Sequence, residues 1–85
     1  MAYTIVITKK AKHDIDALDI VVKKRLGKKL LQVASLDDLR PIAKHLEDSR
    51  IGEYRLRVGD YRILFDLDEK NIVILRVQHR KDVYR

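Results

Sequence analysis

The sequence predicts an α+β domain in which an antiparallel sheet carries an N-terminal helical hairpin on one face. Three patterns along the 85 residues support this prediction. A run of β-branched residues opens the chain, a stripe of apolar residues with helical spacing follows, and from residue 53 onward apolar residues alternate with polar ones. The resulting order, β-α-α-β-β-β, favours two layers, because helices and a sheet bury their apolar faces against each other. The length allows one domain, residues 1–85.

The first strand and the helical hairpin are predicted from the N-terminal part of the chain. Residues 3–8 are rich in β-branched side chains, which favour a strand, and Thr8 is placed to cap the helix that follows. Apolar residues then recur every three or four positions, at Ala11, Ile15, Leu18, Val22, Leu26, Leu30 and Val33. Because Asp19 is a good N-cap in the middle of this stripe, we expect two helices that separate near Leu18.

Residues 36–50 are expected to connect the helices to the remaining strands. They include the one proline of the chain, Pro41, and a short helical turn is predicted for residues 42–46. Acidic residues outnumber basic ones in this connector, whereas lysine and arginine dominate the first and last thirds of the chain. The positive charge is therefore segregated along the sequence.

Three further strands are predicted after the connector. Residues 53–58 alternate between apolar and charged side chains, and Gly59 and Asp60 are residue types of a tight hairpin turn. Residues 61–67 are thus expected to return antiparallel to them. A second turn at residues 68–71 leads into residues 72–77, the most apolar strand, which we expect to be central and buried on both faces.

Composition and charge exclude several classes of protein. The net charge is +6, from 19 lysines and arginines against 13 acidic residues, which favours a nucleic acid or another polyanion as partner. The absence of cysteine excludes a disulfide scaffold, a zinc ribbon and a thiol nucleophile. Neither a membrane span nor a signal peptide is predicted, so we expect a cytoplasmic protein without membrane contact. Metal-ligand spacing and glycine-rich phosphate loops are missing, so we expect no metal and no cofactor.

A cluster of arginines is the main chemical feature of the predicted sheet. Arg55 and Arg57 are two residues apart and share a face of their strand, and Arg62 lies just across the turn. We expect them to form a solvent-facing patch that binds phosphate through guanidinium groups. The alternative is ordinary surface ion pairs with the acidic neighbours Glu53, Asp60 and Asp66. These residue types leave both interpretations open.

The sequence also resembles the RelE/ParE superfamily of toxins from bacterial and archaeal toxin–antitoxin modules. The stretch Gly-Glu-Tyr-Arg-Leu-Arg-Val-Gly-Asp-Tyr-Arg-Ile-Leu-Phe at residues 52–65 is similar to the central motif of that superfamily, and residues 44–46 fit its lead-in. The ending at residues 77–85 has the pattern His-Arg-x-x-Val-Tyr, which points to the RelE branch. The resemblance covers the whole chain, because length and element order also agree.

The resemblance implies roles for individual residues. The implied catalytic residues are Arg57, Arg62, His79, Arg80 and Tyr84. The implied RNA-binding residues are Lys44, Arg55, Lys81 and Arg85. RelE members carry lysines where this chain has Arg55 and Arg57, and arginine is a poor proton acceptor at neutral pH, so the general base stays unassigned.

The predicted function is that of a toxin that cleaves messenger RNA on the ribosome without a metal. Such cleavage needs the 2′-hydroxyl of the RNA to attack the adjacent phosphate, and the arginines suit the stabilisation of the resulting charge. Tyr84 suits base stacking or proton transfer, and His79 suits acid–base work. The alternatives are a ParE-like toxin that inhibits DNA gyrase, since the two branches share one fold, and an inactive family member.

The resemblance further implies a protein partner encoded beside the toxin. We expect a cognate, RelB-like antitoxin with an acidic segment that folds on binding, because this chain is basic. The expected state is therefore a hetero-oligomer with the antitoxin.

Overall fold

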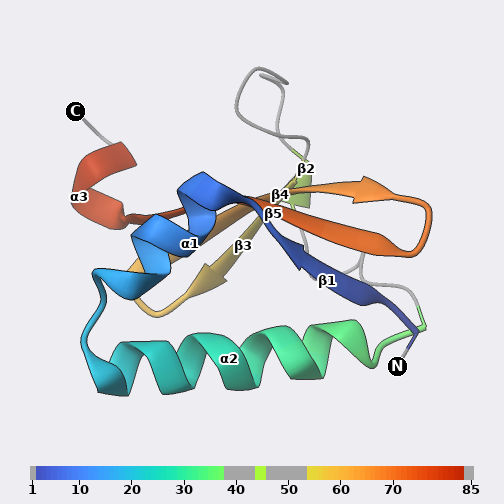
Figure 1. The fold of residues 1–85 in the computed structure, drawn as a ribbon, viewed down its shortest axis with the longest axis horizontal. Helices are drawn as coiled ribbons and strands as arrows, with labels where there is room; N and C mark the ends of the chain where they lie inside the picture. Colours follow the sequence, from blue (N-terminus) through green and yellow to red (C-terminus); the bar gives the residue numbers. More distant parts are fainter. Residues whose placement is uncertain (1, 38–43, 46–53, 84–85) are drawn as a thin grey trace.

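The computed structural model describes residues 2–37, 44–45 and 54–83. Its strands are β1 (Thr4–Ile7), β2 (Lys44–His45), β3 (Tyr54–Val58), β4 (Tyr61–Asp68) and β5 (Asn71–His79). Its helices are α1 (Lys9–Asp16), α2 (Ile20–Ala34) and α3 (Arg80–Val83). Figure 1 shows α2 running along one side of the sheet, so the elements form two layers. The predicted order is confirmed, with the two-residue β2 and the short α3 as additions.

The sheet is mixed, with the strand order β1-β5-β4-β3-β2. β3, β4 and β5 pair antiparallel, as the alternation and the two turns predicted. β1 pairs parallel with β5, from Thr4 opposite Asn71 to Ile7 opposite Ile74, so the predicted antiparallel pairing does not extend to the first strand. Parallel neighbours need a long crossover connection, and the chain from α1 to β4 supplies one.

Strand β2 lies at the other edge of the sheet, where the sequence predicted a helical turn. Lys44 pairs with Arg55 and His45 pairs with Tyr54, both antiparallel. The helical prediction is wrong for these two residues, because extended backbone at this place adds ladder hydrogen bonds to β3. The other residues of the predicted turn lie outside the described part of the chain.

Both predicted N-caps are present and explain where the helices begin. The Thr8 hydroxyl accepts a hydrogen bond from the Ala11 N–H at 3.2 Å at the start of α1. The Asp19 carboxylate accepts from the N–H groups of Val21 and Val22, at 2.9 and 3.1 Å, at the start of α2. These bonds satisfy donors that the first turn of each helix leaves open, so the helical stripe divides where the sequence predicted.

The core lies between α2 and the face of the sheet that is turned toward it. From α2, Leu26, Leu30 and Val33 are buried. The sheet contributes Leu56, Ile63, Phe65, Ile72, Ile74 and Val77. The prediction that helices cover one face is therefore confirmed, although α1 contributes only Ala11 to the buried cluster. Within the described residues, no helix combines the length and apolar character that a membrane crossing needs.

The strand buried on both faces is β4, and the prediction of this role for β5 is wrong. The four successive residues 62–65 of β4 are each no more than 5% exposed. β5 does lie in the interior of the sheet, between β1 and β4, but its buried residues are separated by half-buried ones. Apolar composition shows which side chains tolerate burial, whereas the neighbours of a strand decide which of its faces are covered.

Candidate nucleic-acid interface

The register of β3 and β4 places three arginines on the face of the sheet that points away from α2. Arg57 lies directly opposite Arg62, and Arg55 lies opposite Leu64. Leu56, between the two arginines of β3, points the other way and is buried in the core. Alternation along the strands therefore brings these side chains to one face, as the sequence predicted.

A β-bulge in β5 adds two more polar residues to this face. Arg62 pairs with Gln78 and Leu64 pairs with Arg76, but the next residue, Phe65, pairs with Ile74, so Leu75 is the extra residue. The bulge reverses the alternation along β5. Without the extra residue, Arg76 would share the core side of the strand with Ile74. We call the surface formed by Arg55, Arg57, Arg62, Arg76 and Gln78 the arginine face.

Two side chains from the N-terminal part of the chain hold the bulge. The Thr8 hydroxyl lies 2.8 Å from the Ile74 carbonyl oxygen, to which it donates. The Asp14 carboxylate accepts from the Val77 N–H at 2.9 Å and from Nε and Nη2 of Arg76 at 2.8 and 3.2 Å. Thr8 and Asp14 thus satisfy backbone groups of β5, and Asp14 also anchors Arg76 with a bidentate ion pair.

The electrostatics of Asp14 follow from this geometry. Burial alone raises the pKa of the Asp14 carboxyl, because burial disfavours the charged form. The hydrogen bonds from Arg76 and Val77, together with the positive charge of Arg76, outweigh burial and leave the pKa below its ordinary value of 3.8. Asp14 is therefore ionised at neutral pH and binds Arg76 as a carboxylate.

Exposure differs sharply among the residues of the arginine face. Arg57 is exposed and Arg55 is half-buried, whereas Arg62 is only 4% exposed. The prediction of a solvent-facing patch is therefore wrong for Arg62. Arg62 lies on the middle strand β4, so side chains of β3 and β5 flank it on both sides, whereas Arg57 lies nearer the edge of the sheet.

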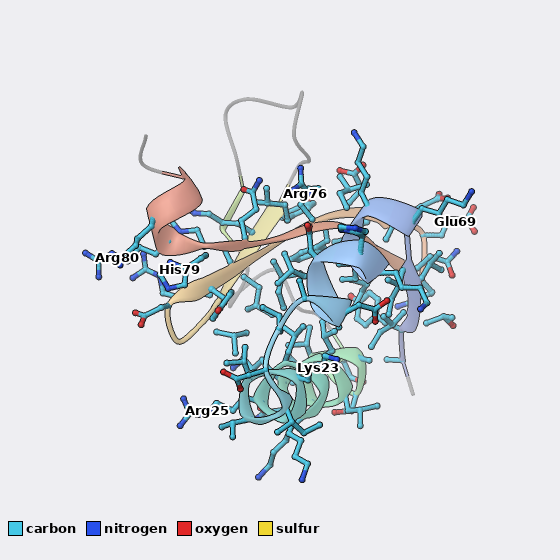
Figure 2. The ribbon with its side chains drawn as sticks, turned by 60° about the vertical axis from the view of Figure 1, so that its left-hand side comes forward. Lys23, Arg25, Glu69, Arg76, His79 and Arg80 are labelled. Carbon is cyan, nitrogen blue, oxygen red and sulfur yellow. The ribbon has the colours of Figure 1, made fainter. Side chains whose placement is uncertain are left out.

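His79 lies on the other side of the sheet from the arginine face. It pairs with Tyr61, which packs against the core, and its ring meets the Tyr61 ring edge-on, with the centroids 5.0 Å apart. Figure 2 shows His79 and Arg80 together where β5 passes into α3, and Arg76 above the sheet on the side away from α2. The structure therefore does not bring His79 together with the arginines of the face.

The remaining predicted site residues lie near the ends of the described part. Arg80 and Lys81 are exposed at the start of α3, and the Arg80 N–H donates to the Asp60 carbonyl oxygen at 2.7 Å. Lys44 pairs through its backbone with Arg55, which places it in the same row as Leu64 and Arg76. Tyr84 and Arg85 lie outside the described residues, as does Glu53, one of the alternative ion-pair partners.

Sequence reasoning missed Asp14 and Arg76 as parts of the site. Both line an open pocket of about 210 Å³ at the β5 edge of the arginine face, together with Lys10 and His13. The sequence carries no local signal for them, because residues 72–75 are four consecutive apolar residues without alternation and Asp14 is 62 positions away from Arg76 in the chain. No group of three or more potential metal-ligating side chains occurs in the described ranges.

Comparisons with known proteins identify the family of the chain. The family model for the ParE toxin of type II toxin–antitoxin systems matches residues 5–84. Toxin RelG of Mycobacterium tuberculosis is 33% identical over 87 residues, which cover 100% of this chain and 99% of that protein.

Solved structures agree with this match. The toxin–antitoxin complex RelBE2 from Mycobacterium tuberculosis contains a chain with a TM-score of 0.80 and 31% identity, covering 93% of this chain and 92% of that one. The RelB–RelE antitoxin–toxin complex from Methanococcus jannaschii gives a TM-score of 0.73 at 25% identity, with 93% and 94% covered. The chain belongs to the ParE toxin family of type II toxin–antitoxin systems, within the RelE/ParE superfamily.

Proposed function

We propose that this toxin cleaves messenger RNA on the ribosome and that the arginine face binds the phosphate at which cleavage occurs. The observation that carries the proposal is the direct pairing of Arg57 with Arg62 across β3 and β4. Paired positions bring two arginine side chains to neighbouring places on one face of the sheet, and guanidinium groups suit bidentate hydrogen bonds to a phosphate. The similarity to toxins with RelE-type names favours RNA over other polyanions.

The chemistry follows from what arginine does well. When the 2′-hydroxyl of the RNA attacks the adjacent phosphate, negative charge accumulates on the phosphoryl oxygens. Arg57 is exposed and placed to meet the substrate, whereas Arg62 is buried and held by its surroundings, so its charge is preorganised and little screened by water. Arg57 and Arg62 thereby stabilise the transition state.

The C-terminal residues complete the proposed site. The bond from the Arg80 N–H to the Asp60 carbonyl oxygen ties α3 to the turn between β3 and β4, which directly follows Arg57 and Val58. α3, which carries Arg80 and Lys81, therefore begins at the end of the sheet where Arg57 and Arg62 lie. We assign base stacking to Tyr84, and phosphate contacts to Arg80 and Lys81.

An antitoxin is the proposed protein partner. The solved relatives include RelB–RelE complexes, so related toxins bind an antitoxin. On this chain, α2 exposes three large apolar residues, Ile20, Val21 and Leu31. Lysines share the exposed surface of the same helix, at Lys24 and Lys28. An acidic amphipathic segment matches both features, because apolar contacts and opposite charges then coincide.

Inhibition of DNA gyrase is the second candidate function, because the matching family model bears the ParE name. One experiment separates the two functions. The full chain is added to a translation extract that contains ribosomes, and in parallel to a gyrase supercoiling reaction. We expect messenger RNA to be cut only when ribosomes are present, with supercoiling unchanged. Inhibition of gyrase without any RNA cleavage would contradict the proposal and establish the alternative.

A further inference from the structure

His79 uses one ring nitrogen to begin the last helix. Its Nδ1 accepts a hydrogen bond from the backbone N–H of Lys81 at 3.1 Å. A neutral imidazole has one acceptor and one donor nitrogen, so an accepting Nδ1 places the proton on Nε2. The edge-on contact with the Tyr61 ring, at an interplanar angle of 89°, fixes the plane of the imidazole.

This hydrogen bond is one of two that satisfy the first backbone N–H groups of α3, which have no partner within the helix. Arg80 is the first residue of the helix, and its N–H donates to the Asp60 carbonyl oxygen at 2.7 Å. Lys81 is the second, and its N–H donates to His79. A side chain just before a helix that accepts from the second N–H is an N-cap, a role usually filled by serine, threonine, aspartate or asparagine. His79 fills that role here.

We propose that His79 is a positioning residue: its neutral imidazole caps α3 and holds this helix, with Arg80 and Lys81, at the end of the arginine face. This inference rests on the proposed function for its effect on cleavage. The pairing of Tyr61 with His79 and of Arg62 with Gln78 sets the start of α3 beside the strand positions that carry Arg57 and Arg62. α3 has a single short turn, so its direction depends on these first bonds.

The same geometry argues against proton transfer by His79. Its Nδ1 is occupied by a backbone donor. Its side chain lies on the α2 side of the sheet, opposite the arginine face, because it pairs with Tyr61. A proton-transfer residue has to reach the reacting oxygen directly or through one water. Capping is therefore the role that the position supports.

Three substitutions of His79 in the full chain separate the two roles. In His79→Asn, the side-chain oxygen occupies about the place of Nδ1 and still accepts from Lys81, but the Nε2–H is lost. His79→Gln is the matched control, because its amide lies at the distance of Nε2 and not of Nδ1. His79→Ala removes both groups. The measurements are hydrogen exchange of the Lys81 amide, read by NMR, and the single-turnover rate of cleavage of ribosome-bound messenger RNA.

We expect His79→Asn to keep both the protection of the Lys81 amide and the cleavage rate close to wild type. His79→Gln and His79→Ala should expose that amide and lower the cleavage rate by up to about fivefold, because a lost N-cap shifts the equilibrium of the helix by about that factor. An Asn variant with a protected Lys81 amide and a cleavage rate as low as that of the Ala variant would overturn the proposal, because His79 would then transfer protons. Unchanged amide protection in all three variants would also overturn it.

Hydrogen exchange of the Lys81 amide tests the cap independently of the proposed function, because it requires no cleavage activity. If the wild-type chain cuts no messenger RNA, the proposed function fails, and exchange at Lys81 alone then decides whether His79 caps α3. Protection in the Asn variant with exposure in the Gln variant supports the cap in that case as well.

Discussion

The two faces of the sheet are built from the same strands, yet they differ in what fills them. The face toward α2 is closed by aliphatic and aromatic side chains, with Phe65 and Ile74 almost completely buried. The opposite face carries arginines on β3, β4 and β5, one of them buried and one exposed. Stability therefore depends mainly on the first face, and the proposed chemistry depends on the second. The bulge in β5 places Arg76 on the arginine face, whereas regular alternation would place it on the core face with Ile74.

Substitutions in the core, on the α2 side of the sheet, are expected to have the largest effect on stability. Phe65→Ala should lower the free energy of unfolding by about 3–5 kcal/mol, because it removes a 1% exposed aromatic side chain and leaves a cavity. Urea denaturation followed by circular dichroism measures this loss. A loss as small as that of an exposed substitution would show that the core does not depend on this face.

Arg62 is expected to contribute to both stability and cleavage, because it is a charged residue of the arginine face that is also buried. Arg62→Ala should abolish cleavage and also lower the free energy of unfolding by about 1–3 kcal/mol, because a buried side chain loses its contacts. Arg57→Ala should leave stability within about 0.5 kcal/mol of wild type, as expected for an exposed residue. Thermal melts of the two variants, measured beside cleavage assays, test the contrast. Equal stability of the two variants would contradict it.

The contacts of Asp14 with Arg76 and Val77 at the bulge predict that the stability of the protein depends on pH. Because the pKa of Asp14 is lowered in the folded protein, its contribution is fully present above the ordinary value of 3.8 and is lost as the pH falls through the folded-state pKa. Asp14→Ala should cost about 1–3 kcal/mol at neutral pH, because it leaves the Val77 N–H without an acceptor. Urea denaturation at neutral pH and well below 3.8 should show the difference from wild type shrinking in acid. A difference that is independent of pH would mean that the ion pair with Arg76 contributes nothing.

The smallest predicted effect compares the two N-caps. Asp19→Ala should cost about 1 kcal/mol, the usual contribution of a cap. Thr8→Ala should cost more, because its hydroxyl caps α1 and also donates to the Ile74 carbonyl oxygen at the bulge. Chemical denaturation of both variants gives the two values. Equal losses would show that the hydrogen bond to β5 adds nothing to the cap.

Local signals in the sequence were enough for most of the fold. The caps at Thr8 and Asp19 depend on residues two or three positions away, and the alternation at Arg55 and Arg57 shows directly which side chains share a face. The family resemblance, carried by residues 52–65 and 77–85, was confirmed by the family match over residues 5–84.

The features that could not be predicted from the sequence depend on contacts between distant parts of the chain. The parallel pairing of β1 with β5 joins the first strand to the last, and Asp14 meets Arg76 from 62 residues away. The burial of Arg62 follows from its place on the middle strand of the sheet. The cap at His79 is local, but histidine is an uncommon N-cap, so its residue type suggested acid–base chemistry instead.

The proposed function requires that a paired arginine on the face away from α2 stabilises the transition state of RNA cleavage. The direct measurement is the single-turnover cleavage of ribosome-bound messenger RNA by wild type, Arg57→Ala and Arg25→Ala. Arg25 is the matched control, because it is an exposed arginine on α2, which lies on the other side of the sheet from the arginine face (Figure 2). We expect Arg57→Ala to lower the rate by roughly 10²–10³-fold, the loss typical of one charge-stabilising group, and Arg25→Ala to cleave like wild type. Cleavage by Arg57→Ala at the wild-type rate would show that the arginine face is not the catalytic surface.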